Sequence, residues 1–134
     1  MKPFVKWAGG KTQLLDKINE KLPKSINNYY EPFIGGGAVL FQFEFKNATI
    51  SDINEELIYT YKCIKNDCNE LIEEITKLDE SHEKDPKEFY YSTREKYNEK
   101  IRNNEKSVEL AAMFIYLNKH CFNGLYRVNS KGLF

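Results

Sequence analysis

A run of glycines after a predicted strand is the first feature of the sequence that can bind a ligand. Residues 31–38 read Glu-Pro-Phe-Ile-Gly-Gly-Gly-Ala, so an extended segment passes through glycines into a predicted helix. Glycine lets the backbone approach a ligand closely, at a helix N-terminus that favours negative charge. Asp52 ends the next predicted strand, where a carboxylate can accept hydrogen bonds from ribose hydroxyls. The pair predicts a site for an adenosine-bearing cofactor; the alternative is a glycine turn that only permits tight helix–strand packing.

The spacing of the glycines separates the possible cofactor classes. A dinucleotide site of the form G-x-G-x-x-G would need its third glycine where Leu40 stands, which disfavours NAD. The segment Lys6–Thr12 superficially resembles a phosphate-binding P-loop, but the first glycine of that motif falls on Val5. There is also no room for the buried strand that precedes a P-loop. We therefore reject a nucleotide hydrolase.

What remains in residues 6–12 is a glycine loop that carries an aromatic ring and a cation at the entry to a helix. Trp7 can pack against a flat or sulfonium-bearing ligand by dispersion and cation–π attraction. Lys11 can meet a carboxylate or a phosphate. The alternative for Trp7 is an ordinary buried core tryptophan, and the alternative for Lys11 is a solvated lysine.

Composition limits the class of protein. The 134 residues are 41% hydrophobic and 30% charged, which is typical of one globular domain. No apolar run reaches the roughly 18–20 residues that span a bilayer, and the N-terminus lacks an apolar stretch of signal-peptide length. We expect an intracellular, cytoplasmic protein without membrane association. Three cysteines and two histidines lack zinc-site spacing, so we predict reduced thiols and no metal.

Charge is balanced overall but not along the chain. Twenty basic and 20 acidic residues argue against a simple electrostatic nucleic-acid binder. No acidic residue follows Glu109, however, whereas Lys119, Arg127 and Lys131 do. The C-terminal segment can therefore face a polyanion, unless the three cations cluster by chance.

Hydrophobic periodicity predicts the elements that position these residues. In the first region, Thr12 is a plausible N-cap and Pro23 a helix end. We predict helix 12–22, strand 28–33, helix 38–45, strand 48–51 and a further helix capped by Asp52 or Asn54. A strand, a glycine turn, a helix and a strand predict the start of a βαβ unit, hence an α/β fold with a parallel sheet.

The second region reads as consecutive helices, because no glycine occurs from about residue 59 to 120. We predict helices over 69–78, 85–102 and 108–117, and the last is apolar almost throughout. It should therefore be buried on every side, at the centre of a small helical bundle. Residues 118–134 turn loop-like, with Asn123-Gly124 as a strong turn dipeptide and Gly132 as another turn candidate.

Four blocks of sequence strongly resemble the Dam-like (class α) adenine-N6 DNA methyltransferases. They are KWAGGK at 6–11, EPFIGGG at 31–37, SDIN at 51–54 and YLNKHCFNGLYRVNSKG at 116–132. They occur in that family's order and spacing, and the resemblance covers the chain from end to end. Four ordered blocks are far more specific than any one of them.

The resemblance implies a fold and a cofactor. Residues 1–58 would begin a Rossmann-like S-adenosylmethionine-dependent methyltransferase domain with few parallel strands. Residues 59–134 would form an α-helical target-recognition region with an incomplete hairpin. The fold as a whole would therefore be dominated by helices. The residues expected to bind S-adenosylmethionine are Trp7, Gly9, Lys11, Phe33, Gly35, Gly37 and Asp52.

Double-stranded DNA is the implied partner. Residues 122–132 would form the hairpin that reads DNA, with Phe122 as a wedge against a base step and Arg127 suited to bidentate contact with guanine. The expected DNA contacts are Asn118, Phe122, Asn123, Leu125 and Arg127. The alternative is a hairpin that is merely a surface turn.

The chain contains no catalytic residue that this resemblance would predict. Family members hold the adenine amine with an Asp-Pro-Pro-Tyr type motif, which is expected beyond residue 134. Asp85-Pro86 matches only its first half, and Pro86 suits the first position of a helix. We expect the chain alone to be inactive, to bind its cofactor weakly and to associate in solution. A separate polypeptide would supply the C-terminal half; the alternative is a non-catalytic DNA-binding or cofactor-binding module.

Overall fold

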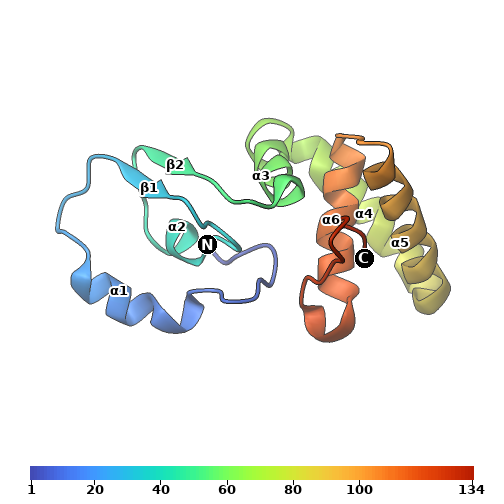
Figure 1. Ribbon diagram of the computed structural model, residues 1–134, viewed down its shortest axis with the longest axis horizontal. Coiled ribbons are helices and arrows are strands. Elements are labelled where there is room, and N and C mark those ends of the chain that lie inside the picture. The colour runs from blue at the N-terminus through green and yellow to red at the C-terminus, as the bar shows by residue number, and fades with distance from the viewer. The chain divides into compact units, whose positions relative to one another are not determined.

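The computed structural model describes residues 1–134 and divides them into two compact units, Met1–Asn54 and Glu55–Phe134 (Figure 1). The predicted boundary at residue 58 lies inside helix α3 (Glu55–Asn66) rather than in a loop. The structural division therefore falls just before this helix begins.

The N-terminal unit contains the predicted strand, glycine turn, helix and strand. Its elements are a 3-10 turn η1 (Thr12–Leu14), α1 (Leu15–Lys21), β1 (Tyr29–Glu31), α2 (Ala38–Gln42) and β2 (Ala48–Ile50). The two strands pair in parallel, with Tyr29 opposite Ala48 and Glu31 opposite Ile50. The parallel pairing and the α/β class are thus confirmed.

Several element ends differ from the prediction. Thr12 does not cap a helix: it is the first residue of η1, and neither η1 nor α1 has a side-chain cap. α2 stops at Gln42 because Phe43 turns extended. The chain then brings the ring of Phe45 onto that of Tyr29, with centroids 3.9 Å apart and nearly parallel. Stacking against the strand is a tertiary contact that a helical pattern does not reveal.

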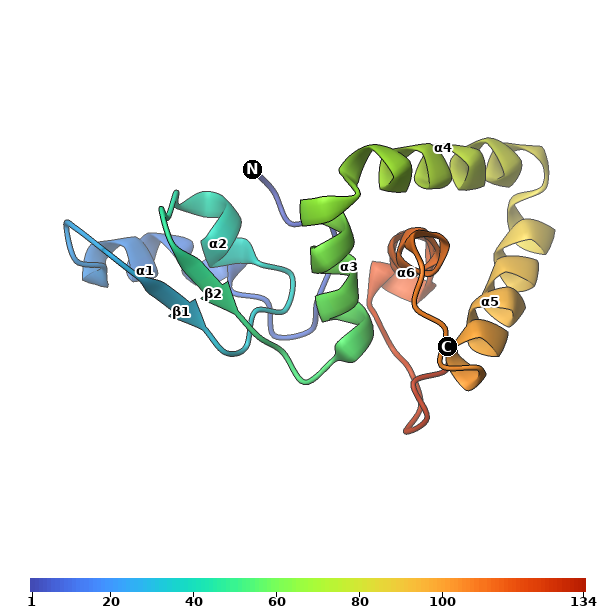
Figure 2. The same ribbon diagram turned by 90° about the horizontal axis from the view of Figure 1, so that it is seen from above.

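The C-terminal unit is a bundle of four helices, α3 (Glu55–Asn66), α4 (Cys68–Lys84), α5 (Pro86–Arg102) and α6 (Val108–His120). Figure 2 looks nearly along α6 and shows the other three around it. Side chains cap α5 and α6: Asp85 accepts from the N–H of Glu88, and Ser107 accepts from that of Leu110. Such caps satisfy N–H groups that have no partner within the helix.

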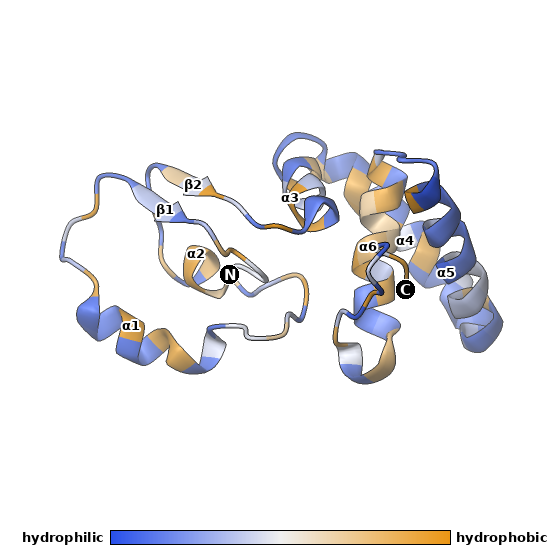
Figure 3. Ribbon diagram, in the orientation of Figure 1, coloured by the Kyte–Doolittle hydropathy of each residue, from blue (hydrophilic) through white to orange (hydrophobic).

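The predicted burial of α6 is confirmed. Its ribbon is largely hydrophobic, whereas α4 and α5 show many hydrophilic residues (Figure 3). Its buried residues are Leu110, Ala111, Ala112, Met113, Phe114, Tyr116, Leu117 and Asn118. A fully buried leucine or phenylalanine contributes about 1.5–3 kcal/mol relative to an exposed one, so α6 forms the centre of this unit's core.

Residues 121–134 form no strand. A short 3-10 turn, η2 (Phe122–Gly124), follows α6, and the chain then runs back to α5. There the side chain of Asn98 holds Phe134 at both ends of its backbone, donating to the carbonyl at 3.1 Å and accepting from the N–H at 3.0 Å. None of the helices is both long and apolar enough to cross a bilayer.

Candidate functional site

The glycine turn and Asp52 lie together at the carboxyl ends of the two strands. The N–H of Gly35 donates to one carboxylate oxygen of Asp52 at 3.0 Å, and the N–H of Asn54 donates to the other at 3.0 Å. Gly35 and Gly37 both have positive φ angles, of 50° and 77°. The parallel pairing of β1 and β2 brings these segments together, because neighbouring parallel strands end on the same edge.

The first glycine segment packs against the second. A Cβ on Gly35 would lie 2.9 Å from Cδ1 of Trp7, and one on Gly36 would lie 3.0 Å from the carbonyl oxygen of Val5. A side chain on Gly35 would require the Trp7 ring to shift, and one on Gly36 would require the Val5 backbone to move slightly, so the packing favours glycine at both positions. Gly9, with φ of 73°, has open space at the same position. The structure thus brings Trp7 to the predicted cofactor turn.

Lys11 is held in the same unit by a carboxylate that our sequence prediction missed. Its ammonium lies 2.9 Å from Oε1 of Glu31 and donates to the carbonyl oxygen of Phe33 at 2.8 Å. Glu31 is buried, and its Oε2 accepts a hydrogen bond from the hydroxyl of Tyr29 at 2.6 Å. A buried carboxylate is stable only with such partners.

The alternation of side chains along β1 contained the signal that Glu31 belongs to this site. Tyr29 and Glu31 are two residues apart in β1 and therefore share one face. Burial, followed by the hydrogen bond to Glu31, raises the pKa of Tyr29, which keeps the phenol protonated as a donor. Lys11 has three N–H donors and uses two, so one remains for a ligand.

Two large apolar side chains stay in solvent at the ends of the strands. Phe33 is 76% exposed and Ile53 is 98% exposed. They follow β1 and β2: Phe33 lies two residues before Gly35, and Ile53 lies next to Asp52. A contiguous apolar patch rimmed by polar groups marks a ligand site, whereas single exposed apolar residues are ordinary. The sequence prediction included Phe33 but not Ile53, although Ile53 directly follows Asp52.

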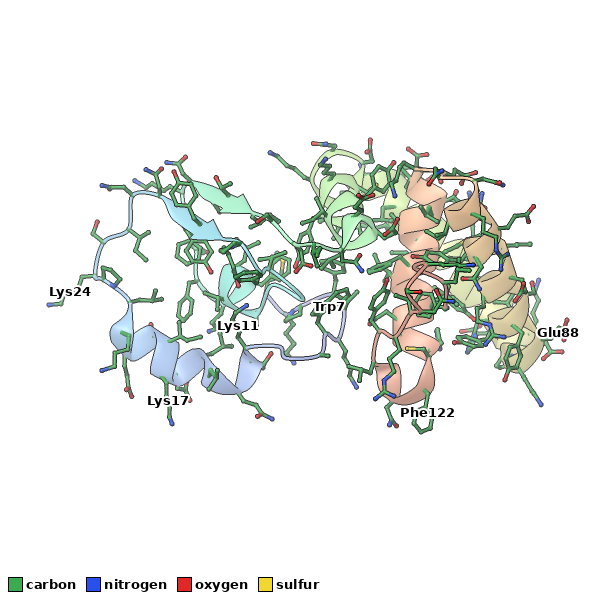
Figure 4. The ribbon with its side chains drawn as sticks, viewed as in Figure 1. Trp7, Lys11, Lys17, Lys24, Glu88 and Phe122 are labelled. Carbon is green, nitrogen blue, oxygen red and sulfur yellow. The ribbon has the colours of Figure 1, made fainter.

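The predicted DNA-contacting segment begins with a tight turn at the end of α6. Asn123 and Gly124 have φ angles of 57° and 61°, so the turn expected at this dipeptide forms. The N–H of Gly124 donates to the carbonyl oxygen of Cys121 at 2.8 Å. Phe122 is 84% exposed and projects beyond the end of α6 (Figure 4). This geometry presents an aromatic ring to a partner.

The other residues predicted to contact DNA differ in how far they are exposed to solvent. Asn123 and Arg127 are exposed, whereas Leu125 is partly buried and Asn118 is only 2% exposed. The Cys121 thiol lies 3.2 Å from the carbonyl oxygen of Asn118 and 3.1 Å from that of Leu125. Burial raises the pKa of this thiol, which keeps it neutral and bound to the turn.

Comparison with known proteins assigns the chain to a family. Residues 7–134 match the D12 class N6 adenine-specific DNA methyltransferases. Type II methyltransferase M.MjaIII of Methanocaldococcus jannaschii is 52% identical over the whole of this chain and 50% of its own length. The DNA adenine methylases of Haemophilus influenzae and Escherichia coli are each 37% identical, over 99% and 98% of this chain and 45% of their own lengths.

The chain spans about half the length of these curated relatives. The family match nevertheless covers nearly all of its residues, including both glycine segments, Asp52 and the turn after α6. The chain therefore belongs to the D12 class of N6 adenine-specific DNA methyltransferases.

Proposed function

We propose that this chain provides the S-adenosylmethionine site and part of the DNA-reading surface for methyl transfer to N6 of adenine in duplex DNA. The convergence of the Gly35 backbone on the Asp52 carboxylate is the observation that supports the cofactor site best. In this proposal residues 1–54 begin a Rossmann-like domain, and the helical unit is a target-recognition region.

Each cofactor residue has a role that its surroundings support. Both Asp52 oxygens accept one hydrogen bond from the protein, and each keeps a lone pair for a ribose hydroxyl. Phe33 and Ile53 would flank the adenine ring with apolar surface. Trp7, Gly9 and Gly37 would line the remainder. The third donor of Lys11 would meet the carboxylate of the methionine part.

S-adenosylmethionine supplies an electrophilic methyl group when bound. The protein's own contribution is to hold that cofactor rigidly, because transfer to a weakly nucleophilic amine depends on alignment. Closely packed glycines at positions 35 and 36 and a carboxylate fixed at both oxygens provide such rigidity.

DNA reading in this proposal depends on the segment after α6. Phe122 would insert against a base step, and Asn123 and Arg127 would contact bases or phosphates. The enclosed side chain of Asn118 supports a positioning role rather than direct contact. Leu125 is partly buried and would contact DNA with the part of its side chain that is exposed.

The 134 residues contain no Asp-Pro-Pro-Tyr sequence. Asp85-Pro86 begins α5 instead, where the Asp85 carboxylate accepts from the N–H of Glu88 at 3.3 Å. We expect no methyl transfer by this chain alone, and transfer after addition of a family polypeptide that supplies the motif.

The decisive experiment has two measurements. Calorimetry with S-adenosylmethionine tests the cofactor site, with Asp52→Ala as the variant that should weaken binding. Transfer of a labelled methyl group to duplex DNA, with and without the complementing polypeptide, tests the reaction. Binding of cofactor and DNA without transfer in either mixture would favour a non-catalytic module. Cofactor affinity unchanged by Asp52→Ala would refute the site assignment.

A further inference from the structure

The helical unit contains a groove beside its C-terminal loop. It has a volume of about 510 Å³ and is bounded by the end of α5 and the final loop. The residues that line it are Ile101, Arg102, Asn129, Ser130, Lys131 and Leu133. Two of these six residues are cations, and none is acidic.

Neither cation is neutralised by the protein. Arg102 and Lys131 are exposed, and their side chains form no ion pair or hydrogen bond within the chain. By contrast, neighbouring Lys100 is occupied by Glu105 at 2.8 Å and Glu109 at 3.4 Å. Those two carboxylates are thus engaged by Lys100.

The end of a helix normally carries partial negative charge, which would oppose an anion here. In α5 that charge is reduced by capping. The N–H of Asn104, with φ of 52°, donates to the carbonyl of Ile101, and the N–H of Glu105 donates to that of Lys100. This is the Schellman arrangement, in which the last carbonyls of the helix are satisfied.

The opposite wall of the groove is fixed by its own hydrogen bonds. Oδ1 of Asn129 accepts from the N–H of Lys131 at 2.9 Å and from that of Leu133 at 3.2 Å. Asn98, which is 4% exposed, binds the backbone of Phe134 on both sides. The loop therefore holds Lys131 near Arg102 without needing a ligand to order it.

We propose that this groove binds a backbone phosphate of duplex DNA. The inference rests on the proposed function, because that function makes DNA the polyanion nearest to the segment after α6. A phosphate diester would meet Arg102, Lys131 and the hydroxyl of Ser130, all of which can donate hydrogen bonds to its oxygens. Such a contact anchors the protein without reading sequence.

The test compares two double variants of the whole chain in fluorescence anisotropy with duplex DNA over a range of salt. Arg102→Gln with Lys131→Gln removes the groove cations. Lys87→Gln with Lys96→Gln removes two exposed lysines from α5 and leaves the same net charge. Circular dichroism melts establish that both variants fold like the parent.

We expect the groove variant to bind about 10-fold or more weakly, with a slope of log affinity against log salt smaller by about 1, as the loss of one phosphate contact requires. The loss should be the same for duplexes of different sequence, and the control should stay close to the parent. Equal salt slopes for the two variants would overturn the proposal. A groove variant that binds DNA as well as the parent would also overturn it, and this is the result expected if the groove binds an acidic protein segment instead. A parent that binds no duplex DNA would overturn it together with the DNA part of the proposed function. Cofactor calorimetry is independent of this outcome.

Discussion

The carboxylate of Asp52 accepts a hydrogen bond from the backbone N–H of Gly35 across 3.0 Å, and this contact joins the ends of both strands. Replacement of Asp52 by alanine removes the proposed ribose acceptor as well as this contact. Hydrogen bonds to a charged group are worth about 1.5–3 kcal/mol, so we expect S-adenosylmethionine affinity to fall at least about 10-fold. Asp52→Asn should lose less, and Asp16→Ala, at an exposed position on α1, should lose nothing in the same calorimetric titration.

A matched pair of glycines tests the packing of Trp7 on the glycine turn. Gly9→Ala introduces a side chain at φ of 73° into open space, which should cost about 1–2 kcal/mol. Gly35→Ala introduces a similar backbone strain and also places a Cβ 2.9 Å from the Trp7 ring. It should therefore lower the free energy of unfolding clearly more than Gly9→Ala does. Urea unfolding measures both free energies. Equal costs would show that the indole moves aside freely.

Glu31 should be important for stability, because it is buried with two partners. Glu31→Gln removes the negative charge that faces Lys11 at 2.9 Å while keeping an acceptor for the Tyr29 hydroxyl. We expect a loss of about 1–3 kcal/mol in the free energy of unfolding. Glu20→Gln, an exposed position in α1, should change it by less than about 0.5 kcal/mol. Similar values for the two variants would contradict the importance of this pair.

Phe122→Ala tests the exposed ring at the end of α6. The side chain is 84% exposed, so its removal should leave the free energy of unfolding within about 0.5 kcal/mol of the parent. Affinity for duplex DNA should fall about 10-fold, since a base–aromatic contact is worth about 1–3 kcal/mol. Ile72→Ala, at a 56% exposed position on α4, is the control in the same anisotropy assay. An equal effect of both substitutions would refute a specific wedge.

A histidine pair predicts that the helical unit loses stability in acid. The His120 ring stacks on His82 at 4.0 Å and lies near Tyr116, Lys119 and Asp79. Burial, then His82 and Lys119, lower the pKa of His120, and Asp79 only partly opposes them. Burial, followed by Asp79 and Tyr90, raises the pKa of Tyr116 to about 12, so its phenol stays neutral in this range.

The direction of this pH dependence follows from the proton that His120 takes up on unfolding. Below the ordinary histidine pKa of about 6.5 the unfolded chain binds a proton that folded His120 resists, so stability is full above that pH and declines below it. Thermal melts between about pH 8 and pH 5 should show a decreasing midpoint, and His120→Phe should flatten the decrease. An unchanged slope in this variant would assign acid sensitivity to other groups.

Much of the fold was predictable from local pattern. The apolar run from Val108 to Leu117 identified α6 as the central helix, because a helix hydrophobic on every side must be buried. Pro86 after Asp85 predicted the start of α5 for an equally local reason. Thr12 failed as a cap, since capping depends on the backbone angles of the first turn, and here that turn is a 3-10 helix.

By itself, the sequence determined the order of the elements, the glycine turn after the first strand, the turn at Asn123-Gly124 and the family. These depend on neighbours along the chain or on residue identity. Only the tertiary structure decided that Lys11 pairs with Glu31, that Asn98 holds Phe134 and that Arg102 and Lys131 share a groove. Those contacts join residues 20 or more positions apart, and their geometry exists only after packing has brought distant segments together.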